Sequence, residues 1–247
     1  GGMKENPYDN PEFFEKYSQM DRSKKGLSGA GEWAALKELL PDFSGKRVLD
    51  LGCGYGWHCA YAAEHGAVSV VGTDISEKMI GEAKKRNPGG QIRYEVTAFE
   101  DCDFPAESFD IIICSLMLHY LEDYGEFLKK VSAWLKTGGN LIFNVEHPVF
   151  TAYGSQDWYY GPCGEILHFP VDRYFLEGKR DACFLGEQVV KYHRTLTTYL
   201  EGLLSHGFAL RHVVEPQPTE EMLREIEGME EELRRPMMLL VSAVKGR

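Results

Sequence analysis

The stretch "VLDLGCGYG", residues 48–56, decides how this chain folds. A run typical of a buried strand leads directly into glycines at positions 52, 54 and 56. Glycine lets the backbone turn sharply and lets a ligand approach without a side chain in the way. The following segment, from Trp57, has the pattern of a helix whose first N–H groups would face the turn. We expect a strand, a tight turn and a helix. The glycines have two possible explanations: a nucleotide-like ligand that approaches the turn, or a turn that needs glycine for steric reasons alone.

An acidic residue further along the chain favours the explanation by a nucleotide-like ligand over the purely steric one. Asp74 closes the next apolar run, "VVGTD", about 20 residues after the glycines, where a carboxylate can accept hydrogen bonds from ribose hydroxyls. The dinucleotide fingerprint G-x-G-x-x-G is not met, because Trp57 holds the place of its third glycine. A pyrophosphate site and a nicotinamide oxidoreductase are therefore disfavoured.

Apolar and amphipathic segments alternate from residue 46 to about 145, as in a parallel sheet covered by helices on both faces. Strands are predicted at 46–51, 68–74, 92–97, 109–115 and 140–146, and helices at 57–65, 76–86 and 122–135. An amphipathic helix is predicted before them, at 10–20, and an aromatic insert after them, up to about 190. The remainder predicts a helix at 194–206, a strand at 208–215, a helix at 219–234 and a strand at 237–245. In the helix at 219–234, one apolar face would be formed by Met222, Ile226, Met229 and Leu233.

Three motifs at compatible spacing make the sequence resemble the class I S-adenosylmethionine-dependent methyltransferases. They are "VLDLGCGYG", "GTDIS" and "FPAESFDIIICSLMLHYL", which span roughly residues 46–145. The resemblance implies an α/β, Rossmann-like three-layer sandwich with a seven-stranded, mostly parallel sheet whose last strand is antiparallel. We expect one domain over residues 3–247, with a helical cap at 3–45 and an insert at 146–193 that forms the acceptor pocket. Gly1 and Gly2 look like a cloning scar.

The resemblance also implies S-adenosyl-L-methionine as the cofactor and S-adenosyl-L-homocysteine as the product. The first motif matches the loop that holds the methionine part, Asp74 the ribose acid, and Ile75 and Met79 the neighbours of the adenine. Ala98 stands where the family often has Asp, so adenine recognition would fall to the backbone at Phe99 and to Glu100, unless Glu100 only caps or faces solvent. The implied cofactor contacts are Asp50, Gly52, Cys53, Gly54, Gly56, Asp74, Ile75, Met79, Phe99, Glu100, Ser115 and Leu116, with Tyr17 and Arg22 as lid residues or, equally, core residues.

Methyl transfer from a sulfonium is an in-line displacement, so the protein has to align the reactants and exclude water. A general base is needed only for a protonated acceptor, and no metal is expected. Ligands of open α/β sheets lie beyond the carboxyl ends of the strands, where the insert would supply an aromatic pocket. The candidate bases are His119, His147 and His193, and the candidate acceptor contacts are Tyr120, Glu146, Tyr174, Arg180 and Arg194. Structural roles are the alternatives, including a surface pair of Arg180 with Glu177.

Composition limits the partners. A net charge of -11 repels phosphate backbones, so no nucleic-acid partner is expected. No apolar run reaches the roughly 18 residues of a membrane helix, and the six cysteines contain no C-x-x-C pair, which suits a reducing compartment. We expect a cytoplasmic methyltransferase for a small-molecule acceptor, without a membrane partner and of unknown oligomeric state. A methyltransferase for protein or RNA, and a non-catalytic S-adenosylmethionine-binding or sensing protein, remain open alternatives.

Overall fold

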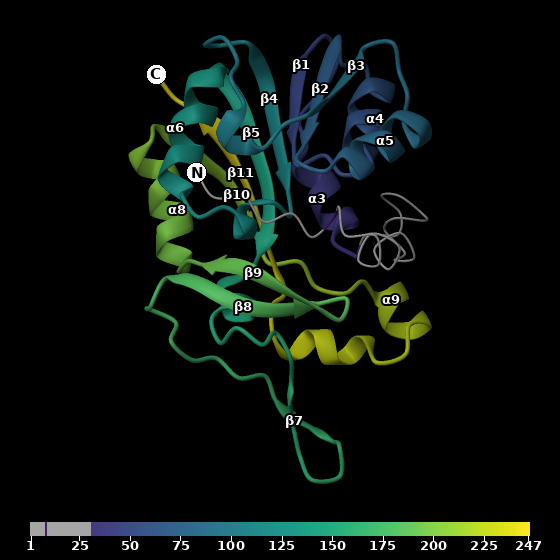
Figure 1. Cartoon of the computed structure of the whole chain (residues 1–247), viewed down its shortest axis with the longest axis vertical. Coiled ribbons are helices and arrows are strands. Elements are labelled where there is room, and N and C mark those ends of the chain that lie inside the picture. The colour runs from purple at the N-terminus through teal and green to yellow at the C-terminus, as the bar shows by residue number, and fades with distance from the viewer. Residues whose placement is uncertain (1–7, 9–30) are drawn as a thin grey trace.

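A seven-stranded sheet organises the molecule in the computed structural model, which describes residue 8 and residues 31–247 (Figure 1). The strand order is β10-β11-β5-β4-β1-β2-β3, and β11 runs antiparallel to both of its neighbours while the other six strands are parallel to one another. This confirms the predicted mostly parallel sheet with an antiparallel last strand. The strands are β1 (Arg47–Leu51), β2 (Ser69–Asp74), β3 (Ile92–Val96), β4 (Phe109–Ser115), β5 (Leu135–Glu146), β10 (Phe208–Val214) and β11 (Met238–Lys245).

Helices cover both faces of the sheet and make three layers. Strand β4 shows why, because Ile111 and Ile113 point into one buried cluster while Ile112 and Cys114 point into the other. Side chains of successive strand residues alternate between faces, so a strand that is apolar throughout needs cover on both. One cluster contains residues of α3 (Trp33–Leu39), α4 (Trp57–Glu64) and α5 (Glu77–Arg86), and the other contains residues of α6 (Tyr124–Trp134) and α8 (Leu196–Ser205).

The helices next to the strands begin at capping residues that the sequence provides. The Ser76 hydroxyl accepts a hydrogen bond from the Met79 N–H at 3.1 Å, which starts α5 as predicted. The Asp123 carboxylate accepts the N–H of Glu126 at 2.9 Å and starts α6 in the same way. Short 3-10 turns, η3 (Phe99–Asp101) and η4 (Leu118–Tyr120), follow β3 and β4.

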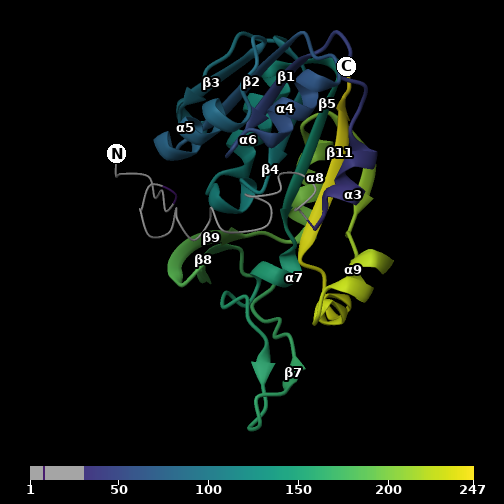
Figure 2. The ribbon, with the colours of Figure 1, turned by 90° about the vertical axis from the view of Figure 1, so that its right-hand side faces the viewer.

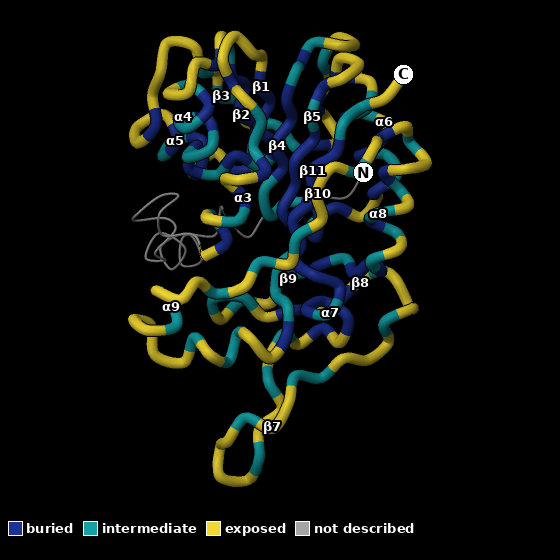
Figure 3. Tube along the Cα trace, turned by 180° about the vertical axis from the view of Figure 1, so that it is seen from behind, coloured by how far each residue is buried: buried dark blue, intermediate teal, exposed yellow. Residues whose placement is uncertain are grey.

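The insert after β5 lies beyond the carboxyl end of that strand in both side views (Figures 1 and 2). It contains two antiparallel hairpins, neither of which the sequence pattern predicted. The hairpin β8–β9 packs against α7 and η4, while β6–β7 forms a projecting arm that is largely exposed (Figure 3). The elements of the insert are α7 (Pro148–Thr151), β6 (Tyr159–Tyr160), β7 (Ile166–His168), β8 (Gly178–Phe184) and β9 (Glu187–His193).

The predicted helix at 219–234 is wrong as a single element. It is divided into α9 (Glu220–Glu225) and the 3-10 helix η5 (Met229–Arg234), because between them the backbone is extended at Ile226 and left-handed at Gly228, with φ of 81°. The expected buried face is wrong too, since Ile226 and Leu233 are 45% and 54% exposed. A 3.6-residue stripe cannot continue across a left-handed break.

The predicted cap at 3–45 is described only in part. The helix at 10–20, Tyr17 and Arg22 lie outside the described residues. Within the described part of this region, Leu36 and Leu39 of α3 are buried in the cluster that α3 shares with α4 and α5. Helix α3 therefore belongs to one of the two helical layers. No helix of the described residues has the length and apolar character needed to cross a membrane.

Candidate active site

The glycine loop between β1 and α4 has the sharp backbone that its sequence predicts. Gly52, Gly54 and Gly56 have φ values of 68°, 53° and 79°, in the left-handed region that glycine adopts without cost. A Cβ at Gly56 would collide with Tyr94 and one at Gly52 would crowd Met117 at 3.0 Å, so protein packing accounts for these two glycines. A Cβ at Gly54 would meet no atom of the described residues within 4 Å. Gly54 is therefore the position where the described residues leave the loop backbone uncovered.

Asp74 lies at the carboxyl end of β2 and holds this loop. Its Oδ2 accepts the N–H of Gly54 at 3.0 Å, and its Oδ1 accepts the N–H of Ser76 at 2.9 Å. The predicted acid therefore stands beside the predicted loop and connects it to the sheet.

Buried polar atoms without a partner among the described residues lie on β1, β5 and at the start of α4. Asp50 is 1% exposed, and its Oδ2 accepts the Cys59 thiol at 3.3 Å. Asp50 Oδ1, Asn144 Oδ1 and the indole Nε1 of Trp57 have no hydrogen-bond partner among the described residues. Burial raises the pKa of Asp50 to about 7. Leaving such groups unsatisfied costs about 1–3 kcal/mol each, so these atoms indicate a place for ligand donors and acceptors.

The other predicted cofactor residues fall at the same edge of the sheet or in the core beside it. Met79 and Phe99 are 2% and 7% exposed, and the Phe99 ring packs against Phe127 and Trp134. Glu100 is exposed, and its backbone carbonyl accepts a hydrogen bond from Lys130.

Ser115 ends β4 and Leu116 follows it with a left-handed φ of 56°, which is uncommon for a non-glycine residue. The N–H of Leu116 donates to the Asn144 carbonyl at 2.7 Å, and the Asn144 amide donates to Glu32 of the segment before α3 at 3.1 Å. Asn144 was not predicted; its signal is a polar residue inside the apolar run "LIFNV".

A polar network is buried where β4 and β5 end. Lys191, on β9, donates to Glu146 Oε1 and Oε2 at 2.8 and 3.0 Å and to Gln156 Oε1 at 2.7 Å. Gln156 in turn donates to Glu146 at 3.0 Å. The insert therefore closes over the last residue of β5 through Lys191 and Gln156, which the sequence analysis missed.

His119 is the fourth member of this network. Its Nδ1 accepts the Glu146 N–H at 3.3 Å, so its protonated Nε2 faces Glu146 Oε1 at 3.8 Å. Burial lowers the pKa of His119 to about 4. Burial acts to raise the pKa of Glu146, but the nearby His119 and Lys191 and the hydrogen bonds from Lys191 and Gln156 together keep that pKa below its usual value. Around neutral pH the network therefore holds a neutral imidazole, a carboxylate and an ammonium group.

His147 and His193 lie near this network, with both ring nitrogens of each bonded within the protein. His147 caps α7 by accepting the Val149 N–H at 3.0 Å, and its other nitrogen donates to Glu215 at 2.5 Å. His193 donates to the Tyr174 carbonyl at 2.7 Å and accepts the Thr151 hydroxyl at 2.7 Å. In this conformation both rings hold protein segments together, and their catalytic roles stay predictions.

Of the remaining predicted acceptor contacts, Arg194 is buried, while Tyr174 and Tyr120 are half-buried. Arg194 is 5% exposed and donates to the carbonyls of Leu118 and Leu121, which fixes η4. The Tyr174 hydroxyl accepts the Leu196 N–H at 3.0 Å at the start of α8. Tyr120 is half-buried, with its hydroxyl 3.4 Å from that of Tyr8.

Arg180 does not form the surface pair with Glu177 that was one alternative. It is 7% exposed and donates to backbone carbonyls, while Glu177 accepts the Thr195 N–H at 2.9 Å. That alternative is wrong, because the inward side of β8 places the guanidinium under the hairpin.

Comparison with known proteins agrees with this geometry. The family model for a methyltransferase domain matches residues 49–143. The crystal structure of an inferred S-adenosylmethionine-dependent methyltransferase from Listeria monocytogenes is 52% identical, with a TM-score of 0.86, over 90% of this chain and 100% of that one. The crystal structure of an S-adenosylmethionine-dependent methyltransferase from Mesorhizobium loti is 43% identical, with a TM-score of 0.83, over 89% and 100%.

A third relative resembles the chain over a shorter stretch. The ubiquinone biosynthesis O-methyltransferase of Coxiella burnetii is 39% identical over 111 residues, which are 44% of this chain and 47% of that protein. The Listeria and Mesorhizobium proteins, in contrast, are matched over their full length. The glycine loop, the acid after β2 and the order of the sheet agree with these identities. The chain therefore belongs to the S-adenosylmethionine-dependent methyltransferases, and S-adenosylmethionine is its cofactor.

Proposed function

We propose that this methyltransferase acts on a small molecule held between the carboxyl ends of β4 and β5 and the insert. The observation that carries the proposal is the buried network of Glu146, Lys191, Gln156 and His119, which brings polar groups of the insert to the end of β5. An enclosed polar cluster of this kind suits a small ligand better than a protein or RNA segment. The Coxiella relative, named for ubiquinone biosynthesis, supports a small-molecule acceptor through the shared half of the chain.

The described residues fit the cofactor. No atom of the described residues would lie within 4 Å of a Cβ at Gly54, which supports a ligand approaching the loop backbone there, and Asp74 stands beside the loop at the end of β2, where the resemblance places the ribose acid. Asp50 Oδ1 and Asn144 Oδ1 are acceptors that an ammonium group would satisfy. When bound, S-adenosylmethionine supplies an electrophilic methyl group on a positively charged sulfur. We therefore keep the predicted set from Asp50 to Leu116 as the proposed cofactor contacts, with Asn144 added.

The proposed work of the protein is orientation and exclusion of water. Tyr120 and Glu146 would contact the acceptor, and Lys191 and Gln156 would fix the Glu146 carboxylate. His119 would act through Glu146, because its Nδ1 accepts the Glu146 N–H and its Nε2 faces that carboxylate. The hairpin β8–β9 would cover the reacting groups, since alignment without water is what an in-line displacement requires.

Two broader expectations become proposals on this basis. We propose that the insert at 146–193 and the sheet act together as one methyltransferase domain, because β9 contacts η4 and α7 and contributes Lys191 to the network. We also propose a reducing, cytoplasmic location, in keeping with four buried thiols at Cys53, Cys59, Cys102 and Cys114.

The testing experiment is a calorimetric titration with S-adenosylhomocysteine, with NADH in parallel, followed by a screen of small acceptors by mass spectrometry. We expect micromolar binding of S-adenosylhomocysteine alone and methyl transfer to at least one acceptor. Binding without transfer to any acceptor, protein or RNA would favour the non-catalytic sensing alternative. Transfer to protein or RNA alone would refute the small-molecule proposal.

A further inference from the structure

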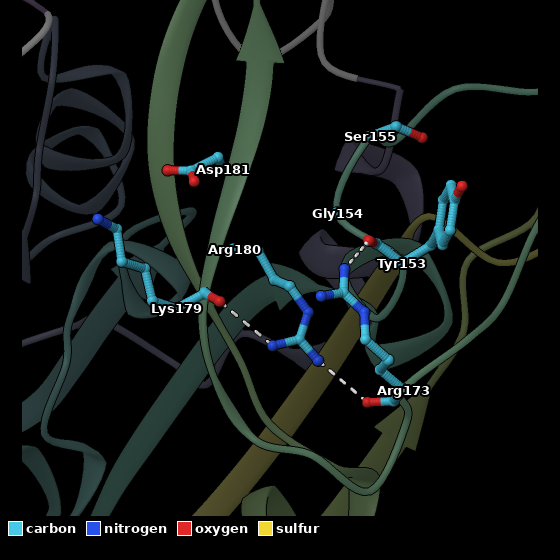
Figure 4. Close-up of a pocket in the computed structure, with 7 residues that line it drawn as sticks. All are labelled: Tyr153, Gly154, Ser155, Arg173, Lys179, Arg180 and Asp181. Carbon is cyan, nitrogen blue, oxygen red and sulfur yellow. Dashed lines mark hydrogen bonds between the residues drawn. The ribbon is translucent and has the colours of Figure 1, made fainter.

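A pocket of about 390 Å³ opens in the insert, next to the polar network (Figure 4). Ser155, which lines it, is the neighbour of Gln156, and Arg180 is paired across the hairpin with Lys191. The pocket thus shares two backbone segments with the network at the end of β5. Its lining residues are Tyr153, Gly154, Ser155, Arg173, Lys179, Arg180 and Asp181.

Arg180 brings a fixed positive charge to this pocket. Its Nε donates to the Ala152 carbonyl at 2.7 Å, and its Nη2 donates to the carbonyls of Arg173 and Leu176 at 3.0 and 2.6 Å. Its Nη1 donates to two further carbonyls at 3.3 and 3.4 Å. Backbone carbonyls hold the guanidinium in place but carry no net charge, so they leave its charge uncompensated.

Arg173 places a second guanidinium beside the first, and Figure 4 shows the two side chains directed toward each other. Its Nη2 donates to the Tyr153 carbonyl at 2.6 Å, and no bond of its Nε or Nη1 to another described residue is found. Arg173 and burial both lower the pKa of Arg180, as expected for two cations held close together. Arg173 also has a left-handed φ of 53°, so its backbone is in an uncommon conformation.

The three carboxylates nearest in sequence are all directed elsewhere. Asp172 accepts the backbone N–H of Arg173 at 2.7 Å, and Glu177 accepts that of Thr195 at 2.9 Å. The Asp181 side chain points away from both guanidinium groups (Figure 4). Within the described part of the chain, neither arginine forms an ion pair, although the whole protein carries a net charge of -11. An acidic protein that leaves two adjacent guanidinium groups without a counter-ion has a place for an external anion.

We propose that Arg173 and Arg180 bind a carboxylate or phosphate group of the methyl acceptor, so that the acceptor is a small anionic molecule. The inference rests on the proposed function for the acceptor's position. Arg173 would supply the direct hydrogen bonds, because its free N–H groups form a planar fork that matches these oxyanions. Arg180, whose N–H groups already bond carbonyls, would contribute its charge.

The test measures thermal unfolding with increasing inorganic phosphate or acetate, at constant ionic strength, up to about 20 mM. The variants are Arg173→Ala, whose side chain is exposed, and Arg224→Ala, which removes one exposed guanidinium from α9 and serves as the charge-matched control. We expect the anion to raise the Tm of wild type and Arg224→Ala, and the apparent affinity to fall at least about tenfold in Arg173→Ala. Absence of any Tm shift in wild type, or an equal shift in Arg173→Ala, would overturn the anion site.

A second measurement separates this inference from the proposed function. Arg173→Ala should bind S-adenosylhomocysteine as wild type does, which also shows that it folds. In an acceptor panel of matched neutral, carboxylate and phosphate compounds, we expect transfer to the anionic members, with KM raised about tenfold in Arg173→Ala and kcat changed less. Transfer confined to neutral members would overturn the inference and leave the small-molecule methyltransferase intact.

Discussion

Replacing Asp74 with alanine tests how the cofactor loop is held. The change removes two hydrogen bonds from backbone N–H groups to a charged acceptor, one from Gly54 in the loop at 3.0 Å and one from Ser76 at 2.9 Å. It also removes the carboxylate proposed to bind ribose. The substitution therefore acts on the free loop and on its ligand together.

The expected magnitude follows from these contacts. A hydrogen bond to a charged group contributes about 1.5–3 kcal/mol, and the lower part of this range applies because Asp74 is only half-buried. Loss of the ribose contact alone, at about 1.5–2 kcal/mol, would weaken S-adenosylhomocysteine binding roughly 10- to 30-fold. Release of the loop should in addition lower the free energy of unfolding by about 1.5–3 kcal/mol.

The matched control is Asp110→Ala. Asp110 also lies in a parallel strand and accepts a backbone N–H, that of Arg47 at 2.9 Å, but near the amino-terminal ends of β4 and β1. Both variants should lose similar stability in urea unfolding, while only Asp74→Ala should lose calorimetric affinity. Wild-type affinity in a folded Asp74→Ala protein, or an equal loss in both variants, would refute the assignment of Asp74.

Three further predictions concern the loop and the network. Gly54→Val should abolish S-adenosylhomocysteine binding. Its control is Gly45→Val, at a similar left-handed φ and with no atom of the described residues within 4 Å of a Cβ, which should bind normally in the same titration. Equal behaviour of the two variants would contradict the argument that a ligand approaches the loop at Gly54. The buried His119 has its pKa lowered from 6.5 to about 4, so the unfolded chain takes up that proton first and stability should fall by about 3 kcal/mol as pH drops through this window. His119→Gln should flatten that part of a urea-unfolding pH profile, and an unchanged slope would show that the ring is already protonated when folded. Lys191→Met should cost about 3–5 kcal/mol because it leaves Glu146 buried without its cation, and Glu146→Gln in the same chain should recover part of the loss in urea unfolding; no recovery would mean that the two residues are not coupled.

The core of the fold could be predicted because its signals are local. Strands β1, β2, β4 and β5 contain apolar runs with buried residues in both clusters, so they need cover on both faces, and Ser76 marks the start of α5 within a few residues. The helix at 219–234 failed because its apolar spacing continues across Gly228, where the backbone does not. The hairpin β8–β9 was missed because Arg180 and Lys191 occupy inward positions where a strand pattern requires apolar side chains.

The candidate site also contains a part that the sequence could predict, made of residues close together along the chain, and a part that it could not, made of residues far apart. The loop, Asp50 and Asp74 lie within one strand–helix–strand unit, so their spacing alone predicted their meeting at the sheet edge. Lys191 lies 45 residues from Glu146 along the chain, and no sequence pattern relates them. Arg194 and His193, which the sequence offered as an acceptor contact and a base, bond the Leu118 carbonyl and the Tyr174 carbonyl, partners that the sequence pattern cannot reveal.

Some non-glycine residues with a left-handed backbone keep side chains that make contacts of their own, outside the ordinary turns at Glu107 and Leu185. Leu116, Gln156 and Arg173 have φ values of 56°, 58° and 53°, a conformation that costs a non-glycine residue about 1–2 kcal/mol. Glycine would adopt this backbone without that cost, so the contacts of a side chain at such a position have to offset the conformational free energy. Gln156 does so by bonding Lys191 and Glu146, and Arg173 by bonding Tyr153. Two of these strained residues therefore belong to the insert, beside the proposed acceptor, which supports acceptor recognition by the insert and cofactor binding by the sheet and its glycine loop.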